Sequence, residues 1–224
     1  MMNYSIMLSA INYSSMIAFL LDGTVKAVEL FFLTIVLSLP LGLLVARLRM
    51  VKFKVILLPV KFYLLIMRGT PLILQLMFFM YFPPLVFGIG VDRFMVAVFS
   101  FTINYAAYFA EIFRGGIESI PVGQQEAAYV LGLSPFQTFT RITVPQVVKR
   151  IIPTIAGESM TLVKDTALAS VIGVTELFRN AGSLKATYSS VIPFAVAALF
   201  YLVMNSVVSA FFSQIEKKLN YYKG

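Results

Sequence analysis

Long apolar runs, separated by short clusters of charged residues, dominate this sequence. The runs cover roughly residues 24–46, 55–84, 94–113, 150–174 and 191–213. A helix needs about 20 apolar residues to cross the hydrocarbon core of a bilayer, which is roughly 30 Å thick, and each run is long enough. The pattern therefore predicts an all-α integral membrane protein with five transmembrane helices.

The composition supports lipid as the main solvent of the chain. Of the 224 residues, 59% are hydrophobic and 12% are charged, whereas charged residues make up about a quarter of an ordinary soluble domain. We expect a single transmembrane domain over residues 1–224, in contact with the bilayer. The net charge of +8 does not indicate nucleic acid, because the lysines and arginines flank apolar runs instead of forming one basic face.

The distribution of positive charge predicts the orientation. Residues 1–25 contain no Lys or Arg, so we expect no secretory signal peptide and an amino terminus that is retained and lies outside. Five spans then place the carboxyl terminus in the cytoplasm. The predicted cytoplasmic cations are Arg47, Arg49, Lys52, Lys54, Arg114, Arg141, Lys149, Arg150, Lys217, Lys218 and Lys223, against Arg93, Arg179 and Lys185 outside. This excess agrees with the positive-inside rule.

Two segments depart from simple spans. Ile11–Leu21 is too short to cross a bilayer, so we expect it at the outer interface. The second run is too long for one straight helix, and Gly69-Thr70-Pro71 is the expected break, because proline removes a backbone donor and glycine adds freedom. The break is either an ordinary proline kink or a discontinuity that exposes polar backbone to a central pathway.

Cysteine and histidine are both absent. Disulfides, thiolate or imidazole catalysis and the common zinc ligand sets are therefore excluded within this chain. We expect no catalytic residue and no metal site, and the redox compartment stays open.

The longest polar stretch, about 115–149, has the local chemistry of two short helices. Pro121 suits a first helical position, the run VGQQEAAYVL contains strong helix formers, and Gly132 suits a left-handed end. Ser134 and Pro135 then predict the cap and first turn of a second helix, which we expect to run toward Arg141 and to end before Pro145.

Apolar side chains cluster around the bend between these two predicted helices. They pack either against the ends of this chain's own helices or against another subunit. The cluster comprises Tyr129, Val130, Leu131, Leu133, Phe136 and Phe139.

The segment EAAYVLGLSPFQTFTRITVP resembles the pattern of permease subunits of ATP-binding cassette importers. Its marker positions are Glu126, Ala127, Ala128, Gly132, Ile142 and Pro145, and Val144 stands where that family more often has Leu. The resemblance implies a short coupling helix that sits in a cleft of a separate ATPase and transmits its motion. The residues expected to make this contact are Glu126, Ala127, Ala128, Gly132, Leu133 and Phe136.

Three further segments, RGTPLILQL, NYAAYFAEIFRGGIESIPVGQQEAA and LVKDTALASVIGVTEL, resemble the subfamily that imports polar amino acids, in particular the arginine, histidine and lysine type. The resemblance implies a dimer with a second permease copy or paralogue, two ATPase subunits and an extracytoplasmic amino-acid-binding protein. This chain has no G-x-x-x-x-G-K-[ST] phosphate loop. We therefore expect a transport subunit and not an enzyme, with no cofactor of its own and with ATP and Mg on the partner ATPase.

Polar residues inside the apolar runs are the candidate substrate site. Glu158 and Asp165 are seven apart on one predicted helix face, and two carboxylates there suit a basic amino acid. The alternative is that they pair internally with Arg68, Lys61 or Lys164. The full candidate set is Thr70, Gln75, Ser100, Asn104, Glu158, Thr161, Leu162 and Asp165. Asn104 is as well suited to an interhelical hydrogen bond as to substrate.

Two other functions fit the same residues. In a stand-alone ion-coupled amino-acid carrier, Glu158 and Asp165 would bind a coupling ion or proton. In a membrane scaffold, the polar loop would be only a tether.

Overall fold

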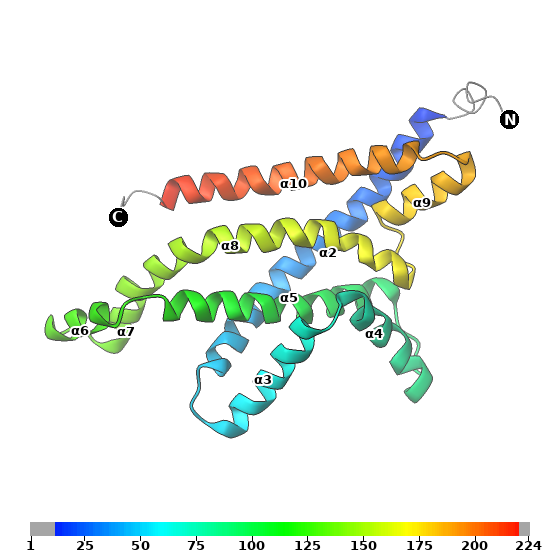
Figure 1. The fold of residues 1–224 in the computed structure, drawn as a ribbon. Helices are drawn as coiled ribbons and strands as arrows, with labels where there is room; N and C mark the ends of the chain where they lie inside the picture. The colour runs from blue at the N-terminus through cyan, green and yellow to red at the C-terminus, as the bar shows by residue number, and fades with distance from the viewer. Residues whose placement is uncertain (1–11, 220–224) are drawn as a thin grey trace. The chain divides into compact units, whose positions relative to one another are not determined.

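The computed structural model describes residues 12–219, and every regular element in that range is a helix (Figure 1). The α-helices are α2 (Tyr13–Arg49), α3 (Lys54–Gly69), α4 (Leu72–Phe87), α5 (Arg93–Glu118), α6 (Val122–Val130), α7 (Pro135–Thr138), α8 (Val144–Asp165), α9 (Leu177–Tyr188) and α10 (Ile192–Leu219). A π-helix, η1 (Phe139–Thr143), precedes α8, and a 3-10 helix, η2 (Thr166–Ile172), follows it.

Three of these helices, α2, α5 and α10, are long and apolar enough to cross a membrane, and α3 with α4 makes a fourth span if the bent pair counts as one. The run predicted at 150–174 forms α8 and η2, which are not among the candidate spans found in residues 12–219. The all-α architecture with several apolar helices is confirmed. The number of five spans and the orientation stay predictions.

The break predicted in the second run is confirmed. The first helix ends at Gly69, and Pro71 has extended backbone with φ −60° and ψ 134°, so α4 begins only at Leu72. The Gln75 side chain supports the turn, because its Nε2 donates to Thr70 Oγ1 at 2.9 Å and to the Thr70 carbonyl at 3.2 Å.

The described part of the predicted amino-terminal segment, from Tyr13 onward, is continuous with the first apolar run in α2, and its position at the outer interface stays a prediction. Asp22 and Gly23 interrupt the apolar run without interrupting the helix. Gly23 instead allows close packing, since a Cβ there would lie 2.8 Å from the backbone of Leu177. Ile11 lies outside the described residues, as does Lys223.

The chain divides into two compact units, and α2, α5, α8 and α10 each contribute residues to both. Among the described residues, the first unit contains 12–35, 70–102 and 160–207, and the second contains 36–69, 103–159 and 208–219. The prediction of one membrane domain stays a prediction.

The core of the first unit joins α2 to the amphipathic helix α9, which the sequence did not predict. Its buried members are Met16, Leu20, Ala27, Leu177, Ala181, Leu184 and Ala197. Asn180, 2% exposed, donates from Nδ2 to the carbonyl of Phe19 at 2.8 Å. The bond fixes α9 against the first turns of α2.

The core of the second unit joins α2, α3 and α5 around Val45, Ala46, Leu64, Ala107 and Ala110. The Tyr63 hydroxyl donates to the carbonyl of Ile103. Small residues permit close approach here too, because a Cβ at Gly42 would lie 2.8 Å from Phe109 Cβ. The second unit also contains the whole polar loop.

Candidate functional site: the polar loop and the polar residues of the spans

The helix α6 begins and ends almost where the sequence predicts. Pro121 is the residue before its first turn and not the first helical position, with φ −58° and ψ 136°. Gly132 adopts φ +74°, as predicted, and its N–H donates to the Tyr129 carbonyl at 2.9 Å while the Leu133 N–H donates to Ala128 at 3.0 Å. The left-handed glycine thus turns the chain out of α6.

The cap predicted for the second short helix is confirmed. Ser134 Oγ accepts from the Gln137 N–H at 3.3 Å, and the Ser134 N–H donates to Gln137 Oε1 at 2.9 Å, which forms a capping box with Pro135 in the first turn.

The predicted end before Pro145 is wrong, because α7 continues through η1 into α8. In η1 the Val144 N–H reaches the Phe139 carbonyl, a span of five residues that widens the backbone. Pro145, which has no N–H to give, lies in the first turn of α8, where that donor is dispensable.

Four apolar side chains around the bend remain uncovered by the chain itself. Tyr129 is 82% exposed, Val130 84%, Leu131 77% and Phe136 75%. Packing against the chain's own helix ends, one of the two alternatives from the sequence, therefore does not occur for these four. Ala128 is the exception in this region, at 1% exposed.

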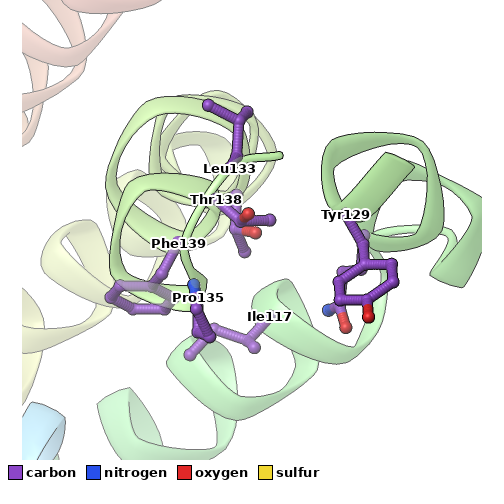
Figure 2. A pocket seen from close by; sticks show the side chains of 8 residues that line it. Ile117, Tyr129, Leu133, Pro135, Thr138 and Phe139 are labelled. Atoms are coloured by element: carbon purple, nitrogen blue, oxygen red, sulfur yellow. The ribbon is translucent and has the colours of Figure 1, made fainter. Parts of the chain in front are cut away.

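One of these exposed side chains, Tyr129, lines a cavity of about 400 Å³. Figure 2 shows Tyr129 of α6 on one side of this space and Pro135, Thr138 and Phe139 on the other, with Ile117 of α5 nearby. Gln125, Leu133 and Thr143 complete the lining. Glu126 and Ala127 lie on the exposed surface of α6. The loop therefore presents a hollowed apolar surface.

The predicted substrate residues of the first unit have varied surroundings. Thr70 and Gln75 are bonded to each other at the break. Ser100 is fully buried and donates to the Val96 carbonyl of its own helix at 2.7 Å. On α8, Leu162 is fully buried, Thr161 is exposed and Asp165 is half-buried.

The predicted substrate residues of the second unit are Asn104 and Glu158. Asn104 is 4% exposed, and its Nδ2 donates to the Met67 carbonyl of α3 at 2.9 Å. This bond is the interhelical link that the sequence offered as an alternative. Glu158 is half-buried on α8. A substrate role for all eight residues stays a prediction.

An ionic cluster around Glu111 was not predicted from the sequence. Glu111 lies 2.6 Å from Arg114, 3.8 Å from Arg49 and 3.8 Å from Arg68, and Arg114 also pairs with Glu118. The three- and four-residue spacing of Glu111, Arg114 and Glu118 was a visible helical signal, whereas the contacts with Arg49 and Arg68 depend on tertiary packing. Arg68, a predicted partner of the α8 carboxylates, is thus in contact with α5.

A second missed residue is Glu176, which lies just before α9 and is 0% exposed. Its carboxylate accepts from the N–H groups of Phe178 and Arg179, both at 2.7 Å, and from the Tyr201 hydroxyl at 3.0 Å. Burial raises the pKa of Glu176 to about 7, against the opposing effect of these donors. The carboxylate caps α9 and links it to α10.

A family model described as "Binding-protein-dependent transport system inner membrane component" matches residues 38–221, which is most of the chain. The chain belongs to this family. It is accordingly a multi-pass membrane protein, as the sequence predicted, and the family assigns it to transport systems that work with a binding protein. A stand-alone carrier and a plain scaffold are both disfavoured.

Relatives within this family match over nearly their whole length. A putative glutamine transport system permease protein GlnP from Rickettsia felis is 33% identical over 93% of this chain and 96% of its own. The arginine transport system permease protein ArtQ from Bacillus subtilis is 34% identical over 91% and 93%.

Solved structures agree with the fold. A chain from a structure titled "Crystal structure of an amino acid ABC transporter with histidines" has a TM-score of 0.84 and 31% identity, covering 93% of this chain and 99% of its own. A chain of the MetNI methionine ABC transporter in an inward-facing conformation has a TM-score of 0.67 at 16% identity, a likeness in fold alone.

Proposed function

We propose that this chain is the permease subunit of an ATP-driven importer for polar amino acids, that basic amino acids are its cargo, and that it works by alternating access. The relatives named for arginine and glutamine transport support an amino-acid cargo. In the proposed arrangement, five spans run from an outer amino terminus to a cytoplasmic carboxyl terminus, and a second permease copy or paralogue completes the pathway.

The observation that carries the proposal is the hollowed apolar surface of α6 and α7. Tyr129 lines the 400 Å³ cavity and is 82% exposed, and Phe136, which follows the lining residue Pro135, is 75% exposed. A surface of this kind beyond the predicted bilayer needs a protein partner. A separate ATPase is the partner we assign to it, because the chain lacks a nucleotide-binding phosphate loop of its own.

Co-purification tests this docking. We expect Phe136→Ala and Gly132→Arg to abolish recovery of an ATPase with the tagged chain, because the first removes an exposed aromatic anchor and the second obstructs the turn beside it. Phe53→Ala is the matched control, since Phe53 is 74% exposed but lies between α2 and α3. Equal loss in the control, or no loss in the loop variants, would refute docking at this surface.

The cargo assignment is supported by the two carboxylates of α8. A half-buried carboxylate such as Glu158 favours a guanidinium or ammonium group, because opposite charges attract more strongly in a medium of low effective dielectric. Glutamine is the second candidate cargo, supported by the relatives named for glutamine transport.

Uptake by cells that carry the full transport system distinguishes these cargoes. We expect Glu158→Gln to reduce arginine uptake at least tenfold relative to glutamine uptake, whereas Glu216→Gln near the end of α10 leaves the ratio unchanged. If Glu158→Gln leaves the ratio of arginine uptake to glutamine uptake unchanged, Glu158 does not determine a preference for basic amino acids. Glutamine uptake exceeding arginine uptake in the unmodified system would establish the second candidate.

A further inference from the structure

The ionic cluster around Glu111 borders a second cavity in the second unit. This cavity has a volume of about 410 Å³ and is lined by Arg49 of α2, by Lys61, Leu64, Leu65 and Arg68 of α3, and by Glu111 of α5. Its charged groups come from three different helices and are brought together only by the fold.

Positive charge exceeds negative charge in the cluster. Arg49, Lys61, Arg68 and Arg114 supply four cations, whereas Glu111 and Glu118 supply two carboxylates, so two positive charges are uncompensated within these six residues. Cations near a hydrocarbon environment are unfavourable without an anion. The cavity therefore has the electrostatics of an anion site.

The guanidinium groups also retain donors. Three guanidiniums share the two oxygens of Glu111, and the contacts of Arg49 and Arg68 with it are 3.8 Å long, beyond hydrogen-bond distance. The Nε of Arg49 is buried and makes no hydrogen bond within the described part of the chain. Arg68 is further held by stacking, with its guanidinium carbon 5.6 Å from the Tyr108 ring centroid. The donors are fixed in position and only partly used.

The face of α3 that carries Lys61 and Arg68 also carries aliphatic side chains. Leu58, Lys61, Leu65 and Arg68 recur at three- and four-residue intervals and so share one side of the helix. Leu58 is 62% exposed and Leu65 is 69% exposed. One side of α3 thus combines cations with uncovered aliphatic surface, which matches the two parts of a phospholipid.

We propose that this cavity binds an anionic phospholipid, with its phosphate held by Arg49, Lys61 and Arg68 and its acyl chains along Leu58 and Leu65. Guanidinium groups match phosphate oxygens through paired hydrogen bonds, and Lys adds a compact charge. Basic pockets between membrane helices take anionic headgroups by the same chemistry. Glu111 limits the affinity by competing for the same donors.

Native mass spectrometry of the full chain in detergent tests the site, with phosphatidylglycerol as the probe and phosphatidylcholine as the neutral comparison. We expect Lys61→Gln to weaken phosphatidylglycerol binding about fivefold and Arg49→Gln/Lys61→Gln about 25-fold. Glu111→Gln changes the charge in the opposite direction, and we expect it to strengthen binding about fivefold. Lys61 is exposed, so the single variant keeps the test valid if the double variant does not fold.

The control variant is Lys217→Gln/Lys218→Gln, which removes two exposed cations at the end of α10. An equal loss of phosphatidylglycerol binding in this control would overturn the proposal, because the attraction between protein and lipid would then be diffuse. Weaker binding in Glu111→Gln would also overturn it, because the ionic cluster would then be purely structural. Displacement of the lipid by millimolar inorganic phosphate alone would assign a free anion and not a lipid. Equal binding of phosphatidylcholine would also reject it.

Discussion

Asn104 of α5 donates a hydrogen bond from its side-chain Nδ2 to the Met67 carbonyl of α3 at 2.9 Å. The acceptor lies in the last turn of α3, just before the break at Thr70 and Pro71. A polar residue that the sequence suggested for substrate thus links two helices beside a discontinuity. The two roles of Asn104 can be tested separately, because a bond that links two helices contributes to the stability of the chain even when no substrate is transported.

We expect Asn104→Ala to lower the free energy of unfolding by about 1 kcal/mol, the range measured for hydrogen bonds between membrane helices. The measurement is thermal unfolding of the full chain in detergent. Ser100→Ala is the comparison, because Ser100 bonds only within its own helix turn and its loss should cost less. Equal effects of the two substitutions would show that the Asn104 bond does not link the helices.

Neighbouring glycines at the end of α5 give a matched pair. A Cβ at Gly116 would lie 2.3 Å from Ile151 Cγ2 on α8, whereas nothing lies within 4 Å of a Cβ at Gly115. We expect Gly116→Ala to destabilise the chain by about 1–3 kcal/mol through overpacking. Gly115→Ala should be neutral or stabilise by up to ~1 kcal/mol because alanine favours the helix. Thermal unfolding of both variants checks this, and a reversed order would exclude close packing of α5 on α8.

The turn after α6 depends on the left-handed conformation of Gly132 at φ +74°. We expect Gly132→Ala to cost roughly 1–2 kcal/mol and Gly132→Asn to cost less, since Asn tolerates this region better. Gly123→Ala, inside α6 with open space around its Cβ, is the control and should not destabilise. Unfolding midpoints of the three variants provide the test. If Ala and Asn are equivalent at position 132, backbone strain is not the cause.

Stability should depend on pH through Glu176. Because burial raises the pKa of this carboxyl to about 7, the folded state holds its proton across a range in which the unfolded state, with a pKa near 4.5, has lost it. The resulting stability is fully present below pH 4.5 and disappears as pH rises through about 7, by ~3 kcal/mol in total.

The measurement is the unfolding midpoint between pH 4.5 and 8 for the unmodified chain and for Glu176→Gln. We expect the Gln variant to lose this slope, whatever its overall stability. Tyr201→Phe removes one donor to the carboxylate, so we expect the slope to extend to higher pH. Identical slopes in the unmodified chain and Glu176→Gln would contradict the assignment.

Local chemistry explains what the sequence could predict. Proline and glycine determine their own backbone, so the break at Pro71, the turn at Gly132 and the cap at Ser134 were all visible. The helix α9 was missed because its buried face is short and includes the polar Asn180, and its burial depends on α2, more than 150 residues away in the chain.

Long-range contacts explain the rest. Nothing local to Glu111 distinguishes it from an ordinary helical ion-pair partner, since its contacts with Arg49 and Arg68 require α2 and α3 to pack on α5. The segment before Asp22 was assigned to the interface because it is too short to span a bilayer by itself, yet α2 continues through Asp22 and Gly23. Sequence periodicity reports local preference and cannot report which helix covers another.

The unbroken passage from α7 through η1 into α8 has a mechanical consequence. From Pro135 to Ser159 the chain is one continuous helical rod within a single compact unit, and it carries exposed Phe136 near one end and Glu158 near the other. Displacement of one end is transmitted toward the other through the helical hydrogen bonds. The wider π-turn at Phe139–Thr143 and Pro153 inside α8 are two places where the rod departs from regular α-helical hydrogen bonding, so they set how much of a push becomes rotation and how much becomes translation.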